Sequence, residues 1–230
     1  RRIRSRARTS PPCLSPPMLR SFALVLFAFA FAPSPVSAQR VFLDPHARGV
    51  VYGGGAFAGQ STIEVHGSGG GSLSGSADLD PTALFGLRYE QPIVSCFLLG
   101  TNLGVWRYQD QQTDARRTWF DLGVVPTLAF DFDLGKIALE PRLSVPIGAS
   151  MHLFRSDDQD ALDLFGVSRA NPGLHVGVLG GLGVYFSHGF GLMLELGYEH
   201  HQAFAKGSGD TKWRLSQNQM VLQMGLVLPL

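Results

Sequence analysis

The chain has 230 residues and a formal net charge of +1 at pH 7, but its charges are unevenly distributed. Six of its 19 Lys and Arg residues and none of its 18 Asp and Glu residues precede residue 39, so the remainder has a net charge of about −5. This balance gives a nucleic-acid partner no electrostatic support, and the remaining length, roughly 190 residues, suits one domain better than two.

The first 38 residues have the parts of a secretory signal peptide. A basic, proline-rich stretch, residues 1–17, precedes Met18, and an apolar run over residues 22–32 leads to the small-residue site Val36-Ser37-Ala38. The run is shorter than the roughly 20 residues of a transmembrane helix, which leaves an uncleaved amphipathic anchor as the alternative. We predict that Met18 is the true start, that cleavage exposes Gln39, and that residues 39–48 are a periplasmic lead-in. Cleavage leaves Cys96 as the only cysteine, so no intramolecular disulfide is possible.

Eight later segments alternate apolar and polar residues with the period of two that is typical of β-strands. They are residues 49–59, 82–90, 95–108, 118–131, 136–153, 173–186, 190–201 and 213–230. In residues 136–153 every odd position except Pro141 is apolar, while the even positions include Glu140, Arg142 and His152. This alternation is longer than an ordinary strand of about five or six residues, and it favours a strand that crosses a bilayer at a tilt. The facing of the first segment cannot be assigned.

The connections between these segments alternate between long and short. Residues 60–80, rich in Gly, Ser and Asp, have the composition of a flexible loop, and polar loops are also expected after the third, fifth and seventh segments. The other connections are tight turns. An even number of strands, with short turns at one end and long loops at the other, is typical of transmembrane barrels with both termini in the periplasm.

Aromatic residues lie near both ends of the predicted strands, as expected for two girdles at the membrane interfaces. The group near the long loops is Trp106, Tyr108, Trp119, Tyr198 and Trp213, and the group near the turns is Tyr89, Phe130, Phe132, Phe186 and Phe190. The alternative is a secreted soluble barrel with an apolar interior, which would show the same alternation. The polar face argues against it, because it consists mostly of Gly, Ser, Asn and Gln and would make a poorly stabilised solvated surface.

These features resemble the small eight-stranded outer-membrane β-barrel proteins of Gram-negative bacteria, the OmpA/OmpX-like superfamily. The resemblance covers residues 49–230 and rests on pattern and topology. It implies an all-β, antiparallel up-and-down transmembrane barrel, exported to the outer membrane, with chaperones and the barrel assembly machinery as partners in transit. Outer-membrane lipid and lipopolysaccharide would surround it, and it would be a monomer. One departure is the C-terminus, which ends in Leu230 where such barrels typically end in an aromatic residue.

Charged residues on the polar face predict an ion-pair network that fills the lumen, because charges removed from water must be paired. These residues are Arg88, Glu90, Glu140, Arg142, Glu195 and Glu199. The network acts either as a fixed plug or as a gate whose switching opens a small pore, which is what the resemblance implies such networks can do.

Other candidate sites carry little chemistry. His200 and His201 would point to opposite faces of a strand and cannot chelate one ion, so we interpret them as surface histidines. Ser187-His188 lies in a predicted turn without a convincing supporting carboxylate. Residues 67–75 lack the ending of a phosphate-binding loop, and the acidic residues between 157 and 163 lack the ordered spacing of a calcium site. We predict no catalytic residue, cofactor or metal.

The sequence thus predicts an outer-membrane β-barrel with a structural or surface-interaction role and loops presented to the environment. A narrow, porin-like pore for small solutes is the first alternative, and a lipid-modifying outer-membrane enzyme is the second.

Overall fold

The computed structural model describes residues 47–67, 70–109, 116–154, 168–186, 190–207 and 211–230, so the predicted signal peptide lies outside the described residues. The described residues form strands joined by turns. The strands are β1 (Arg48–His66), β2 (Ser72–Leu79), β3 (Thr82–Val94), β4 (Phe97–Gln109), β5 (Arg116–Ala129), β6 (Phe132–Asp133), β7 (Ile137–Ser144), β8 (Ile147–Phe154), β9 (Ala170–Phe186), β10 (Gly191–Lys206) and β11 (Lys212–Pro229). Among these residues, no helix is long and apolar enough to cross a membrane.

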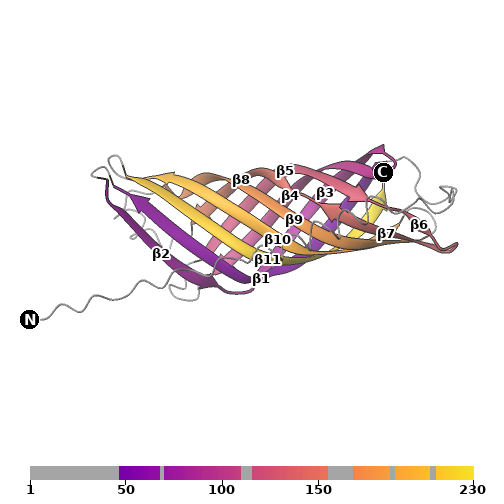
Figure 1. Cartoon of the computed structure of the whole chain (residues 1–230), viewed down its shortest axis with the longest axis horizontal. Coiled ribbons are helices and arrows are strands. Elements are labelled where there is room, and N and C mark those ends of the chain that lie inside the picture. Colours follow the sequence, from indigo (N-terminus) through magenta and orange to yellow (C-terminus); the bar gives the residue numbers. More distant parts are fainter. Residues whose placement is uncertain (1–46, 68–69, 110–115, 155–167, 187–189, 208–210) are drawn as a thin grey trace, which may run out of the picture. The chain divides into compact units, whose positions relative to one another are not determined.

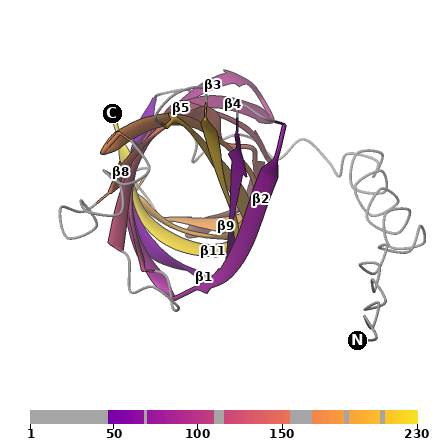
Figure 2. The same ribbon diagram turned by 90° about the vertical axis from the view of Figure 1, so that its left-hand side faces the viewer.

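The strands close into an antiparallel ring, which confirms the predicted eight-stranded up-and-down barrel (Figures 1 and 2). The eight strands of the ring are β1, β3, β4, β5, the pair β7 and β8 counted as one strand, β9, β10 and β11. They pair in chain order, and β11 closes the ring by pairing with β1. Strands β2 and β6 are additions to the ring, and they pair with β1 and β7, respectively. The strands are staggered relative to one another. A path that starts at Val50 and steps from each residue to its partner on the next strand returns to β1 at Ser61, eleven positions further along. The path passes through Arg88, Asn102, Gly123, Gly148, His175, His201 and Gln217. This stagger tilts the strands, and eight tilted strands enclose an interior just wide enough for side chains to fill.

Strands β7 and β8 together form the long strand predicted over residues 136–153. Both pair with β5 and β9 in one unbroken register, and Val145 and Pro146 are the two residues that separate them. Two prolines explain the gap, because neither Pro126 nor Pro146 has an N–H to donate. Their carbonyl groups still accept hydrogen bonds, from Val145 N (3.0 Å) and Gly177 N (2.9 Å), so the wall stays closed.

We call the end of the barrel at which β1 begins, β11 ends and the short turns lie the turn end. Leu230 N donates to Ala47 O (2.9 Å) there, and β6 and β7 form a small hairpin whose turn contains Gly135 at φ +90°. A glycine is favoured at this left-handed position because it has no Cβ. The opposite end, where β1, β4, β8 and β10 finish, is the loop end.

The expectation of a flexible loop over residues 60–80 was wrong. Strand β1 continues to His66 and pairs with both β11 and β2, whose residues Ser72–Leu79 run back along it. The β-branched residues Thr62, Ile63 and Val65 favour an extended backbone, and this preference outweighs the loop-like composition of the Ser/Gly segment that follows. Strand β10 likewise extends to Lys206, into another predicted loop.

The two faces of the wall have opposite chemistry. Outward side chains are large and apolar, as at Leu87 (55% exposed) and Val178 (52% exposed), whereas inward positions hold fully buried polar groups such as Glu90 and Gln217 (both 0% exposed). A soluble barrel needs the reverse arrangement, with its apolar side chains inside. An apolar outer wall around a polar interior is the arrangement of a transmembrane barrel.

Candidate functional site

The half of the lumen nearer the turn end holds a network of three arginines and three glutamates, which we call the ion-pair network. Its members are Arg48, Arg88, Arg142, Glu90, Glu140 and Glu195, none more than 5% exposed. They come from four strands on different sides of the ring, β1, β3, β7 and β10. Alternation places each of them inward, and the equal numbers of positive and negative side chains balance the buried charge.

Arg48 contacts two of the three glutamates of the network. Its NH1 and NH2 lie 2.9 and 3.0 Å from the two carboxylate oxygens of Glu140, and its Nε donates to Glu90 Oε2 (3.0 Å). Tyr185 joins this pair, since its hydroxyl accepts from Arg48 NH1 (2.7 Å) and donates to Glu140 Oε1 (3.1 Å). Such two-pronged, charge-assisted contacts are the strong form of the interaction.

Arg142 lies at the centre, because it contacts all three carboxylates. NH2 donates to Glu90, NH1 donates to Glu140 Oε1 (3.2 Å), and Nε lies 3.0 Å from Glu195 Oε1 without donating a hydrogen bond to it. Arg88 NH1 lies 2.9 Å from Glu195 Oε2.

Neutral side chains complete the lining of the network. Ser144 Oγ and Gln223 Nε2 each donate to Glu195 (both 2.8 Å), and Thr127 Oγ1 donates to Ser144 Oγ (3.0 Å). The network therefore links strands across the whole width of the lumen.

The structure brings together five of the six charged residues predicted for the lumen. The sixth, Glu199, lies apart from them beside His201 (3.2 Å from Oε2 to Nε2). The sequence analysis missed Arg48, which was assigned to the lead-in, and the part played by Tyr185. Its position in the sequence could have revealed Arg48, because it is an even-numbered residue like Val50 and Tyr52, which face inward on β1.

The half of the lumen nearer the loop end contains rings and histidines, and we call it the aromatic chamber. Trp106 stacks on Tyr108 (6.0 Å between centroids), which meets Trp119 edge to face (5.6 Å). His201 contacts the edges of both tryptophans, at 5.3 and 4.7 Å. Gln219 Nε2 donates to the Tyr108 hydroxyl (2.7 Å).

Polar groups in the aromatic chamber are less completely paired than those of the ion-pair network. Asp121 Oδ1 lies 3.7 Å from Nδ1 of both His175 and His201, which is too far for a hydrogen bond. Within the described part of the chain, Asp121 Oδ1, both ring nitrogens of His175 and both amide atoms of Gln217 have no hydrogen-bond partner. No group of three His, Cys, Asp or Glu side chains among the described residues is positioned to hold a metal ion.

The chamber corrects two interpretations of the sequence. Trp106, Tyr108 and Trp119 were expected in an interfacial girdle, but they are 3%, 3% and 0% exposed and lie inside the barrel. His201 is no surface residue either, because its side chain is fully buried, whereas His200 on the opposite face bonds Asn218 Oδ1 (2.7 Å).

The remaining predicted girdle residues lie elsewhere. Tyr198 faces outward, as do those of the turn-end group, Tyr89, Phe130, Phe132, Phe186 and Phe190, each between 38% and 47% exposed. Trp213 is half-buried near the loop end. The turn-end group therefore faces outward, as the side chains of a girdle must.

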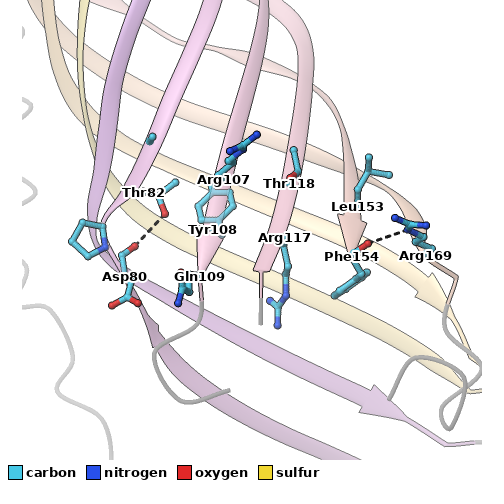
Figure 3. Close-up of a pocket in the computed structure, with 12 residues that line it drawn as sticks. Asp80, Thr82, Arg107, Tyr108, Gln109, Arg117, Thr118, Leu153, Phe154 and Arg169 are labelled. Carbon is cyan, nitrogen blue, oxygen red and sulfur yellow. Dashed lines mark hydrogen bonds between the residues drawn. The ribbon is translucent and has the colours of Figure 1, made fainter. Parts of the chain in front are cut away.

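A third feature is a pocket of about 690 Å³ at the loop end, which we call the rim pocket (Figure 3). It lies where β4 and β8 end and β3, β5 and β9 begin. Its lining includes Asp80, Thr82, Arg107, Tyr108, Arg117, Phe154 and Arg169. Arg169 Nε donates to Phe154 O (3.3 Å), and the Arg117 guanidinium lies over the Phe154 ring, 5.4 Å from its centroid.

Neither a family model nor a curated protein matches the sequence. The chain is similar in fold to solved outer-membrane proteins. Neisserial surface protein A is 12% identical, with a TM-score of 0.43 over 79% of this chain and 97% of that one. The outer membrane protein AlkL in lipid bilayers is 16% identical (TM-score 0.43, covering 86% and 98%), and the outer membrane protease OmpT from Escherichia coli is 7% identical (TM-score 0.42, covering 84% and 100%).

Proposed function

We propose that this protein is an outer-membrane β-barrel with a structural or surface-interaction role, whose lumen is plugged and whose loops are presented to the environment. The observation that supports this role is the ion-pair network, which spans the lumen with balanced, buried charges inside an apolar outer wall. Each strand edge of the ring is paired within one chain, so no partner is needed for closure and the barrel acts as a monomer. Outer-membrane lipid and lipopolysaccharide surround it after export.

Fractionation and gel mobility test the location. The protein is expected in the outer-membrane fraction and is expected to migrate differently before and after boiling in detergent, because a closed barrel has all its backbone hydrogen bonds internal. Sequencing of the mature N-terminus is expected to begin at Gln39. Recovery from the soluble periplasm without a mobility shift would overturn the proposal.

The second candidate is a narrow pore gated by the ion-pair network. The observation that favours it is that the network joins side chains from β1, β3, β7 and β10 across the lumen, so that a rearrangement of these ion pairs would change how that half of the lumen is filled. Planar-bilayer conductance distinguishes plug from gate. Negligible currents for both the wild type and Arg142→Ala support the plug, whereas discrete openings that the substitution changes support the gate.

We propose no enzymatic role. The histidine and carboxylate groups of the aromatic chamber resemble catalytic groups in type, but Asp121 and His201 are at most 2% exposed inside the wall, where a lipid chain cannot reach them. Lipid A mass is therefore expected to stay unchanged when the protein is expressed. A new lipid A mass that disappears in His201→Ala would favour the enzyme instead.

A further inference from the structure

Three histidines lie together in the aromatic chamber. His152, His175 and His201 come from the adjacent strands β8, β9 and β10, and each is at most 3% exposed. His66, by contrast, is exposed, and His200 lies on the outer face of β10. Histidine is the side chain that gains a positive charge on mild acidification. The chamber therefore concentrates groups that respond to pH.

Two carboxylates face these imidazoles, and both of them face His201. Glu199 Oε2 lies 3.2 Å from His201 Nε2, and Asp121 Oδ1 lies 3.7 Å from His201 Nδ1. The other buried carboxylates of the described residues are the three of the ion-pair network. A proton on His201 thus has a negative charge on either side, so the closed chamber can hold this positive charge.

His152 and His175 lack such compensation. In the described part of the chain, His152 makes no ion pair or hydrogen bond through either ring nitrogen, and its ring meets Trp119 edge to face. His175 shares Asp121 with His201 (3.7 Å from Nδ1 to Oδ1), and the two imidazole rings stack 5.6 Å apart. A proton on either residue would therefore place a positive charge against an apolar ring or a second cation. Burial of such a charge away from water is unfavourable.

The other strands around the chamber add no further carboxylate among the described residues. Tyrosines on β1 and β4 and glutamines on β11 stay neutral in acid, namely Tyr52, Tyr108, Gln217 and Gln219. Arg117 on β5 is a cation, and so is Arg88 of the network, whose guanidinium lies over the Tyr52 ring. Three imidazoles thus face two carboxylates, and full protonation leaves the histidine cluster with a positive charge in excess.

We propose that acid draws water into the aromatic chamber through protonation of His152 and His175, while the ion-pair network keeps the other half of the lumen closed. An imidazolium is more stable in contact with water than in a dry interior, so acid favours a hydrated chamber. Water has a route from the loop end, because Tyr108 lines both the rim pocket and the chamber, and β8 ends two residues after His152. The proposal goes beyond the plug, since it makes one half of the lumen responsive to pH.

The test measures how readily acrylamide quenches Trp106 and Trp119 at pH 8 and at pH 4.5. The full barrel in detergent micelles carries Trp213→Phe, so that these two buried residues are its emitting tryptophans. The test variant adds His152→Gln with His175→Gln. The matched control adds His66→Gln with His200→Gln, which removes two histidines outside the chamber. The boiling-dependent mobility shift, measured at both pH values, shows whether the barrel stays closed.

We expect the quenching constant of the parent protein to rise at least about twofold at pH 4.5 and to return at pH 8, because water and quencher enter together. The rise should persist in the matched control and disappear in the test variant. His152→Gln alone should remove about half of the rise, and it replaces the test variant if that variant loses its mobility shift.

Two results would overturn the proposal. One is an unchanged quenching constant in acid, or equal rises in the test variant and the matched control. The other is loss of the mobility shift at pH 4.5 in every protein, because acid would then open the whole barrel and not one half of its lumen. Neither result bears on the outer-membrane location, which fractionation tests separately.

Discussion

The two halves of the lumen satisfy their buried polar groups in different ways. In the ion-pair network three guanidinium groups form ion pairs with three carboxylates, and a serine hydroxyl and a glutamine amide donate further hydrogen bonds to Glu195. In the aromatic chamber, Asp121 and Glu199 have histidines as their ion-pair partners, and several buried polar atoms are unpaired within the described part of the chain. Ion pairs between arginines and glutamates thus fill the half of the lumen nearer the turn end, and aromatic and histidine rings fill the half nearer the loop end.

This difference predicts different responses to substitution. A buried charge in a matched set becomes costly as soon as its partner is removed, because the remaining charge has neither water nor a counter-ion. A polar group that lacks a hydrogen bond loses little when it is replaced by a neutral group of the same shape. The ion-pair network should therefore be sensitive to single changes that the aromatic chamber tolerates.

The largest effect is expected for Arg142→Ala. This change removes the one side chain that contacts Glu90, Glu140 and Glu195 together, and leaves three carboxylates facing two arginines. The free energy of unfolding, measured by urea titration in lipid vesicles, should fall by about 3–5 kcal/mol. Arg107→Ala is the control, since this exposed arginine should change stability by no more than about 0.5 kcal/mol. Equal stability of the two variants would show that the network does not hold the barrel together.

Matched carboxylate substitutions compare the two halves directly. Glu90→Gln weakens contacts with Arg48, Arg88 and Arg142, and should cost up to about 3 kcal/mol in the same titration. Asp121 has only histidines as ion-pair partners among the described residues. Asp121→Asn keeps the shape of this side chain and should cost less than about 1 kcal/mol. If Asp121→Asn proved the more damaging change, the chamber and not the network would be the rigid part of the lumen.

A smaller effect is expected for Tyr185→Phe. The ring stays, but Arg48 and Glu140 both lose a hydrogen bond to the hydroxyl, at a cost of about 1.5 kcal/mol or somewhat more. Tyr198→Phe is the matched control, because this tyrosine faces outward at 47% exposure and should be nearly neutral. A loss of equal size in both variants would point to a general effect of tyrosine hydroxyls.

Alternation of side chains explains what could be predicted from the sequence. It identified the eight strands, the inward facing of Arg88, Glu90, Glu140 and Arg142, and the outward facing of the apolar residues. Alternation gives the face of a residue and its position along a strand. It does not give the stagger between strands, and therefore could not show that Glu199 lies level with His201 and Asp121, away from the ion-pair network.

The errors about the aromatic residues have a different cause. Trp106 and Tyr108 share parity with the inward residues Asn102 and Gly104, and Trp119 shares parity with Asp121, so their facing was contained in the pattern. The girdle prediction used only the distance of these residues from the loops, and it ignored the alternation that places them inside the barrel. The extension of β1 past residue 60 could not be predicted from alternation. The composition of this segment is compatible with a strand or a loop, and its pairing with β2 and β11 stabilises the strand.

Quenching by brominated lipid tests the inward position of these tryptophans. In a Trp213→Phe background the fluorescence comes from Trp106 and Trp119, since the chain contains three tryptophans. Both lie behind the wall, so bromine in the acyl chains should quench them little. Adding Leu122→Trp places an indole next to Asp121 but on the outer face, at a position that is 65% exposed, and this emission should be strongly quenched. Equal quenching in the two proteins would return Trp106 and Trp119 to the lipid interface and leave the chamber without its aromatic lining.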